Sequence, residues 1–462
     1  MAASEDDLHH LITDREGKSI YTDRPGSHQQ QKLRSEDGKP SNKITEQENS
    51  RPRIRKVSDM LRNDRNLEKY YEPRAVSIGP LHYGKNKFSL AEKQKLKVAK
   101  LFIKENSLDE LIPYNKIKMQ IERLKQCYVE EDIKRININD DNLAWKFLFD
   151  GFALLHFIRY ASIGKLNDLK IEMNVEAFSQ QDLFLIENQI PYQVLDEIMT
   201  SLADGGANMR NSIDKFIDQT VRDIRGPSFR ETSSPTSSQP APAHLLELLW
   251  KRLVGDHEEK KAKTGKTETI RTGQNQKVKT ETGMQIRNVN KLKASGIQLK
   301  TGTEGPLRDI SFASHWFTGT LTLPSLVVDD STVPKLLNLI AFEMCPDFDN
   351  DSQVTSYIFF LHTLIDRPDD VKELQKAHIL HNALESDEEV ARLFKEICTD
   401  LDSIPEAFLE VKDRIQKHCE KKWKTWMGFN NPWTLFALAA AIAVLVMSCS
   451  SRLGAPLIES DN

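Results

Sequence analysis

Apolar residues recur along most of the chain with the three-to-four-residue spacing of amphipathic helices. Residues 386–401, SDEEVARLFKEICTDL, carry one such stripe, and so do residues 181–202, QDLFLIENQIPYQVLDEIMTSL, where Pro191 should kink or divide the helix. Residues 145–160, WKFLFDGFALLHFIRY, are almost continuously apolar, but charges interrupt them and they are too short to span a membrane. These patterns predict a mainly α-helical protein in which residues 145–160 form a buried helix.

Helix starts and one strand can also be predicted. Ser89 and Glu92 are placed as a capping box at the start of SLAEKQKLKVAKLFIKE, and Ser386 and Glu389 form the same pattern. One stretch alternates instead, because apolar residues and Gly319 occupy every second position from Phe317 to Leu323, with threonines between them. This period of two predicts a strand of a small β-hairpin element, ended by Pro324.

Polar segments divide the chain. Residues 1–55 are rich in Ser, Asp, Glu and Lys, and we expect a disordered N-terminal region because such a composition cannot bury enough apolar surface. A second polar stretch, at about 226–285, is first Ser/Pro-rich and later rich in Lys, Thr and Gly, with the short apolar piece LLELLWKRLV inside it. Apolar helices lie on both sides. We therefore predict one large helical domain over 56–428, interrupted by a disordered insert.

The C-terminal region predicts a single transmembrane helix over 432–451, followed by a short tail, 452–462. Its core runs 19 residues from Trp433 to Ser451 without a charge. At about 1.5 Å per residue, such a helix nearly spans a hydrocarbon core of roughly 30 Å. The predicted anchor residues are Trp433, Leu435, Phe436, Leu438, Ile442, Val444, Leu445 and Val446.

The charges that flank this span predict its orientation. Lys421, Lys422 and Lys424 precede it, and Arg452 alone follows closely. The basic flank of a membrane helix usually stays in the cytosol, so we expect the large N-terminal body to be cytosolic. The protein should then be a single-pass protein of the plasma membrane or of an endomembrane.

Composition narrows the function classes. The chain has 64 basic and 68 acidic residues and a net charge of −4, which gives no support to nucleic-acid binding. Its five cysteines show no Cys-x-x-Cys spacing, so neither a zinc site nor a disulfide framework is indicated. These features fit a protein body in a reducing compartment.

Short motifs for cofactors and metals are incomplete. The stretch KTGKT lacks the first glycine of a phosphate-binding loop, since position 260 is Lys. The stretch DFDND lacks the glycine and the final glutamate of an EF-hand, and His378 and His381 have no third ligand nearby. We therefore predict no catalytic residues, no cofactor and no metal site.

Several motifs, taken in order, resemble one family. EPRAVSIGPLHYGKNKFSLAEKQK is similar to the signature VSIGPYHHG followed by ME-x-HK of the plant domain of unknown function 247, and DLFLIENQIPYQVL is similar to its D-x-x-LLENQIPFxVL. The pieces LFDGFALLHFIR, HLLELLW, KLKASGIQLK, SYIFFLHTLID and NPWTLFALAAAIAVL resemble further blocks, so the resemblance covers roughly residues 55–450. The signature residues are Val76, Ser77, Ile78, Gly79, Pro80, His82, Gly84, Glu187, Asn188, Gln189 and Pro191.

The chain departs from this pattern beside its histidine. Leu81 and Tyr83 stand where the family usually has Tyr and His, and Ala91 replaces the usual Met. A lone His82 fits a structural turn better than a site that needs paired histidines. The flanking glycines and Pro80 favour such a turn, because they permit or fix the backbone angles that it requires.

The resemblance implies a plant membrane protein of unknown biochemical activity. Some grass members resemble the male determinants of self-incompatibility, which implies recognition between proteins or cells. We expect a membrane-anchored interaction, recognition or signalling component, not an enzyme, that binds membrane lipid through its C-terminal helix and binds unidentified protein partners. An alternative hypothesis is an unrecognised enzyme with a site around His82 and Glu187, which a wide separation of these two side chains would exclude.

Overall fold

The computed structural model describes residues 52–62, 67–169, 180–230, 241–255, 288–315, 318–348, 352–399, 408–429 and 440–448. Within these ranges the protein is mainly helical, as predicted. The predicted disordered N-terminal region lies outside the described residues up to residue 51.

The N-terminal half is built around one long helix. Its elements are α2 (Asp59–Arg62), η1 (Glu68–Tyr70), η2 (Asn86–Phe88), α3 (Ser89–Asn106), α4 (Leu111–Met119), α5 (Ile121–Gln126), α6 (Glu130–Lys134), α7 (Asp140–Ser162), η3 (Leu166–Leu169), α9 (Tyr192–Met199) and α10 (Ala207–Arg225). Helix α7 is the predicted buried helix, and it packs against α3, α4, α9 and α10. The near-continuous apolar run follows from this position, because neighbours cover the helix on several sides.

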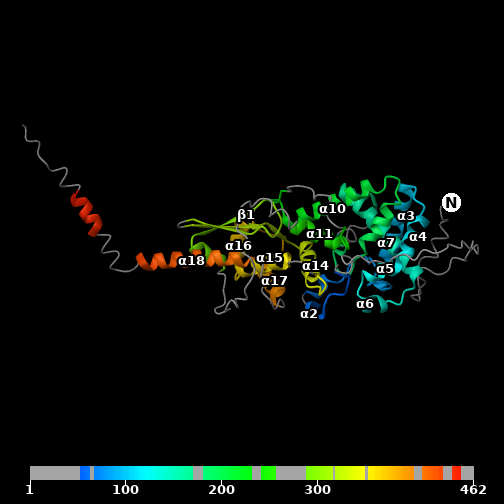
Figure 1. The fold of residues 1–462 in the computed structure, drawn as a ribbon, viewed down its shortest axis with the longest axis horizontal. Helices are drawn as coiled ribbons and strands as arrows, with labels where there is room; N and C mark the ends of the chain where they lie inside the picture. Colours follow the sequence, from blue (N-terminus) through cyan, green and yellow to red (C-terminus); the bar gives the residue numbers. More distant parts are fainter. Residues whose placement is uncertain are drawn as a thin grey trace, which may run out of the picture.

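The C-terminal half combines helices with two small sheets. Its elements are α11 (Leu245–Val254), α13 (Val289–Ala294), β1 (Ile297–Gly302), β2 (Ser311–Ser314), β3 (Gly319–Pro324), β4 (Leu326–Val328), α14 (Thr332–Glu343), α15 (Gln353–Leu364), α16 (Pro368–Lys376), β5 (Leu380–Asn382), α17 (Asp387–Thr399) and α18 (Leu409–Phe429). Figure 1 shows α3 to α7 at one end of the molecule and the sheet with α16 to α18 at the other, with α10, α11 and α14 between them.

The predicted hairpin is present and is part of a larger sheet. Strands β2 and β3 pair antiparallel, and β3 also pairs in parallel with β1, in register Leu299↔Leu321. Leu321 and Leu323 are buried, as the alternation predicted, and the strand ends at Pro324. A second, two-stranded sheet pairs β4 with β5 in parallel; their short apolar runs carry no period-two pattern long enough to predict them.

One predicted helical segment and one predicted helix cap are wrong. Residues 183–191 do not form a helix: they run as turns and irregular backbone, and α9 begins only after Pro191, its N-cap residue. Their apolar side chains are buried all the same, because the whole loop lies inside the protein.

The first capping box is not formed either, because Phe88 caps α3 and Glu92 instead contacts Lys95. Half of the second box is present, since Ser386 Oγ accepts a hydrogen bond from Glu389 N at 3.1 Å.

One continuous hydrophobic core joins residues from both halves of the chain. Within the predicted insert at 226–285, residues 241–255 are ordered and hold α11, whose Leu246 and Leu249 are fully buried, so the prediction of disorder is wrong for this piece. The apolar run LLELLWKRLV explains the difference, because burial of its leucines offsets the entropy of ordering the helix. Residues 231–240 and 256–285 lie outside the described residues.

The C-terminal region is described only in part. None of the helices in the described ranges combines the length and the apolarity needed to cross a membrane. Of the predicted span at 432–451, residues 432–439 and 449–451, and with them Trp433, Leu435, Phe436 and Leu438, lie outside these ranges. Residues 440–448, drawn in red in Figure 1, form a helix on which Ile442, Val444, Leu445 and Val446 are 54–65% exposed. The transmembrane helix stays a prediction.

Helix α11 gives a pH-dependent element of stability. His244 caps it, since its Nδ1 accepts a hydrogen bond from Glu247 N at 3.2 Å, and burial lowers the pKa of His244 to about 4. The unfolded side chain titrates at about 6.5, so between these values only the unfolded chain binds the proton. The contribution of His244 to the free energy of unfolding is therefore fully present above pH 6.5 and is lost as the pH falls toward 4.

We predict that acidification from pH 7 to pH 5 lowers the free energy of unfolding by about 2 kcal/mol through His244 alone. Urea unfolding of the wild type and of His244→Asn at both pH values measures this. Asparagine caps a helix without titrating, so the variant should lose that part of the pH dependence. Other buried groups, such as Asp182, titrate in both proteins and cancel in the comparison. Equal pH dependence in the two proteins would contradict the assignment.

Candidate functional site

The residues of the predicted signature form two buried loops that lie against each other. We call residues 76–84 the signature loop and residues 187–191 the ENQIP loop. The signature loop precedes α3, the ENQIP loop precedes α9, and most of their residues are buried. Neither loop has regular secondary structure, so their backbone groups need hydrogen-bond partners from elsewhere.

Asn188 joins the two loops directly. Its Oδ1 accepts a hydrogen bond from Ile78 N at 2.7 Å, and its Nδ2 donates to Val76 O at 3.0 Å. The same amide also donates to Asp182 O at 2.9 Å. One buried side chain therefore pairs with the loop backbone as a neighbouring strand would.

Gln189 holds the ENQIP loop in place from within. Its Nε2 donates to Leu183 O and to Leu185 O, each at 2.8 Å, and its Oε1 accepts from Leu246 N of α11 at 3.2 Å. Its own carbonyl oxygen accepts a hydrogen bond from the Tyr128 hydroxyl at 2.9 Å. Pro191, two residues later, is the N-cap of α9. The loop is thus tied to both halves of the chain.

Asp182 binds the backbone at the start of the signature loop and just before it. Its carboxylate accepts hydrogen bonds from Arg74 N, Ala75 N and Val76 N at 2.6–3.1 Å. Burial raises the pKa of Asp182 to about 6, even though the three backbone donors act in the opposite direction. The side chain, which is 2% exposed, therefore holds three consecutive backbone amides in place.

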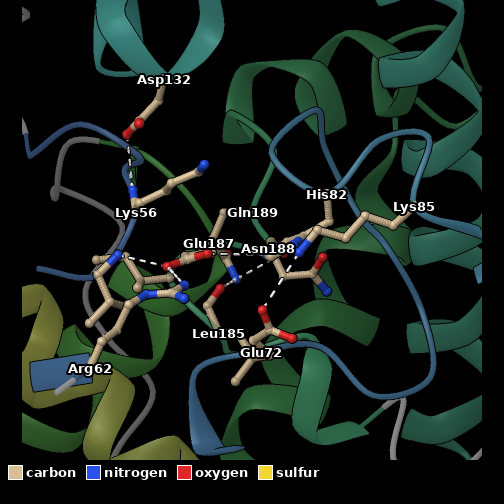
Figure 2. Close-up of polar contacts among 12 residues, drawn as sticks. Lys56, Arg62, Glu72, His82, Lys85, Asp132, Leu185, Glu187, Asn188 and Gln189 are labelled. Carbon is tan, nitrogen blue, oxygen red and sulfur yellow. Dashed lines mark hydrogen bonds and ion pairs between the residues drawn. The ribbon is translucent and has the colours of Figure 1, made fainter. Parts of the chain in front are cut away.

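Glu187 and His82 meet inside the protein, as Figure 2 shows. His82 Nε2 lies 3.3 Å from Glu187 Oε2, and the two side chains are 2% and 1% exposed. Glu187 Oε1 also accepts two hydrogen bonds, one from Val57 N at 2.7 Å and one from the Arg62 guanidinium. The wide separation that would have excluded the enzyme hypothesis is therefore absent.

The electrostatics of this pair favour a neutral imidazole beside a carboxylate. Burial lowers the pKa of His82, and the neighbouring carboxylate only partly opposes this. Burial by itself raises the pKa of Glu187, but the contacts from His82 and Arg62 outweigh it, and the pKa is lowered. His82 also sits in a tight turn, since Tyr83 N donates to Pro80 O at 2.9 Å. The structural turn predicted from the sequence is present.

A charged cluster beneath the signature loop was not predicted. Lys95 of α3 and Lys146 of α7 both contact Asp150, at 2.5 and 2.9 Å, and Asp150 accepts a hydrogen bond from Gly79 N at 2.8 Å. Both lysines also face Ser77 O, at 2.7 and 3.4 Å. Lys95, Lys146 and Asp150 are almost fully buried.

Burial and the neighbouring carboxylates act in opposite directions on the two lysines of this cluster, and burial is the stronger effect on Lys95, whose pKa is lowered. Burial by itself would lower the pKa of Lys146, but the Asp150 and Glu92 carboxylates outweigh it, and the pKa is raised. The cluster pairs two lysines with two carboxylates, and removing one member would leave an unpaired buried charge that costs about 3–5 kcal/mol. Lys146 and Asp150 are four residues apart in the apolar run of α7, and this spacing is the signal that could have identified the pair.

Gly79 is the tightest point between the two loops. It has φ = +71°, and a Cβ atom there would lie 2.3 Å from Gln189 O. Gly84, at the other end of the signature loop, has φ = +75°, and a Cβ there would meet nothing within 4 Å. Both positions favour glycine for backbone reasons, but only Gly79 needs it for close approach.

We predict that Gly84→Ala lowers the free energy of unfolding by about 1–2 kcal/mol, the cost of a left-handed alanine. Gly79→Ala should cost that amount plus about 1–3 kcal/mol for forcing the ENQIP loop away. Urea unfolding of the two variants beside the wild type measures the difference, and Gly84→Ala is the matched control for backbone strain. Equal losses in the two variants would show that the loop contact contributes nothing.

Comparison with known proteins places the chain in one family. The model of the plant proteins of unknown function DUF247 matches residues 54–447. UPF0481 protein At3g47200 of Arabidopsis thaliana is 25% identical, with 82% of this chain and 81% of the relative aligned. Putative UPF0481 protein At3g02645 of the same plant is 22% identical, with 82% of this chain and 85% of the relative aligned.

No solved structure matches the chain. The family match covers both buried loops, the charged cluster and the helices that hold them. The resemblance inferred from the signature motifs is confirmed. The chain belongs to the DUF247 family of plant proteins of unknown function.

Proposed function

We propose that this protein is a membrane-tethered interaction or signalling protein, whose helical domain binds protein partners and whose C-terminal segment binds membrane lipid. The observation that carries this proposal is the apolar C-terminal segment. Its sequence is uncharged from Trp433 to Ser451, and on the helix at 440–448 five apolar side chains are more than half exposed. Lipid would cover this apolar surface, which water solvates poorly.

The segment before it supports a cytosolic body. Helix α18 carries exposed lysines, among them Lys417 and Lys421, and the sequence continues with Lys422 and Lys424. Each basic residue near an anionic leaflet contributes about 1 kcal/mol of attraction. Only Arg452 follows the apolar segment closely, so the charge asymmetry favours a domain that faces the cytosol, at the plasma membrane or an endomembrane.

The domain offers a surface for partners at the end opposite α18 (Figure 1). Helix α4 exposes Leu111, Ile112 and Met119, and the Met119 side chain is 87% exposed. Ile112 and Met119 are seven residues apart and therefore share one face of the helix. Exposed apolar residues gathered on one helix are typical of protein-binding surfaces.

We predict that an N-terminal tag is digested and a C-terminal tag is protected when protease is added to intact microsomes that hold the full-length protein. Deleting residues 433–451 should release the protein from membranes and change its proximity-labelled partners. A deletion of equal length in the polar insert, 262–280, is the control. The proposal is wrong if the deletion of 433–451 leaves both the location and the partners unchanged.

Acid–base catalysis by His82 and Glu187 is a second candidate function. The 3.3 Å distance between His82 Nε2 and Glu187 Oε2 favours it, because acid–base catalysis often uses an imidazole beside a carboxylate, although this contact does not have the geometry of a hydrogen bond. Against it stand the burial of both side chains and the use of Glu187 by Val57 N and Arg62.

Chemical accessibility separates the two candidates. We predict that diethyl pyrocarbonate modifies the exposed His378 and leaves His82 unmodified in the native protein, with His82 reacting only after unfolding. Peptide mass spectrometry after a short exposure reads both sites in one sample. A His82 that reacts in the native state as fast as His378 would favour the catalytic candidate, since a substrate must reach the same imidazole.

A further inference from the structure

Helix α3 presents a row of lysines to solvent. Its buried side chains pack toward α7, and six side chains on the outer side fall within about 100° of the helix circumference at 3.6 residues per turn. These six are Leu90, Lys93, Lys97, Lys100, Leu101 and Lys104. All are exposed or half-buried, and the two leucines are 58% and 40% exposed. The lysines occupy the centre of this face and the leucines lie along one edge.

We call Lys93, Lys97, Lys100 and Lys104 the lysine row. Among the described residues, no carboxylate forms a salt bridge with any of its four ammonium groups. The two nearest acids along the helix have other partners, since Glu92 contacts Lys95 and Glu105 binds Arg159 and Tyr160.

The row is costly to the helix that carries it. Like charges four residues apart on a helix repel each other, and the row contains two such pairs, Lys93 with Lys97 and Lys100 with Lys104. The four charges follow about 17 Å of the helix axis. A row of carboxylates laid along α3 would relieve this repulsion, and aliphatic side chains beside them would cover the two exposed leucines.

The chain itself contains a segment with this pattern. Residues 5–14, EDDLHHLITD, hold four carboxylates and neither lysine nor arginine, and we call them the acidic segment. Leu8, Leu11 and Ile12 follow the spacing of one helix face, with the acidic residues on either side of it. Carboxylates bordered by aliphatic side chains are the complement of lysines bordered by leucines.

The connection between the acidic segment and the described body is long enough for this contact. Residues 15–51 lead from the segment to the strand-like backbone at Ile54, which pairs with Tyr128 in the same half of the chain as α3. At about 3.3 Å per residue the connection reaches up to roughly 120 Å, several times the ~20 Å radius of gyration of a domain of this size. Tethering gives an effective concentration on the order of millimolar, so individually weak surface ion pairs suffice.

We propose that the acidic segment binds along α3 of its own chain, with its carboxylates on the lysine row and its aliphatic side chains beside Leu90 and Leu101. The proposal is independent of the membrane-tether function. An acidic partner that uses the same face of α3 has to displace the segment first. The segment therefore regulates access to the lysine row.

Zero-length cross-linking of the full-length protein in phosphatidylcholine nanodiscs tests the contact. A carbodiimide joins a carboxylate to a lysine amine where the two groups touch, and peptide mass spectrometry identifies the joined residues. We expect links from the acidic segment to the lysine row about tenfold more often than to Lys215 of α10. Lys215 is the matched control, because it is exposed and has no salt bridge among the described residues. Mixing isotope-labelled and unlabelled protein shows whether the links form within one chain.

A fluorescent peptide of residues 5–14 measures the competition by anisotropy. In full-length protein whose segment is neutralised (Glu5→Gln, Asp6→Asn, Asp7→Asn and Asp14→Asn), the face is vacant. The peptide should therefore bind this variant about tenfold tighter than it binds the wild type. Changing the lysine row to glutamine in the same background should abolish binding, whereas changing it to arginine should preserve it, because arginine keeps the charge. Thermal unfolding by circular dichroism checks that each variant is folded.

Each of four results would overturn the proposal. Links to Lys215 as frequent as links to the lysine row would show a contact without specificity. Equal peptide affinity for the wild type and the neutralised variant would show that the segment leaves the face open. Equal binding to the glutamine and arginine variants would place the peptide elsewhere. Links that form in phosphatidylcholine nanodiscs and are lost in phosphatidylserine nanodiscs would assign the face to an anionic leaflet.

Discussion

The structure depends on the need to hydrogen-bond irregular backbone that is buried away from water. The signature loop and the ENQIP loop are mostly buried, and neither has a helix or a sheet to pair its amides. Side chains supply the hydrogen bonds instead. Asn188 and Asp182 bind the backbone of residues 74–78, and Gln189 donates to the carbonyls of residues 183 and 185. An unpaired buried amide costs about 1–3 kcal/mol, so this arrangement can exist only because the partners are fixed in place.

The charged cluster extends the same constraint to the helices. Asp150 accepts from Gly79 N and contacts Lys95 and Lys146, and it therefore fixes the signature loop to α3 and α7 together. Just before the ENQIP loop, Ile186 N donates a hydrogen bond to the side-chain oxygen of Asn338 on α14 at 3.0 Å. The same side chain donates to Tyr70 O at 2.9 Å. The two halves of the chain are thus joined through polar contacts at the loops as well as through the apolar core.

This use of the signature residues bears on function. Asn188, Gln189 and Asp182 are occupied by backbone groups, and Glu187 is held by Val57 N and Arg62. A family signature can therefore reflect a folding requirement of its buried loops. The surface features lie elsewhere: the apolar residues of α4 are at one end of the body, and α18, which leads toward the apolar segment, is at the other (Figure 1).

The sequence by itself determined the helical class, the buried helix α7, the strand β3 and the family, because periodicity and ordered motifs are local properties of the chain. It also predicted a turn at His82 from Gly79, Pro80 and Gly84. It could not predict that residues 183–190 form a loop, since their apolar spacing fits a helix equally well and only the contacts of Asn188 and Gln189 decide between the two. The pairing of Lys95 with Asp150 and of His82 with Glu187 was decided by the tertiary structure alone, because each joins residues far apart in the chain whose separation no local pattern encodes.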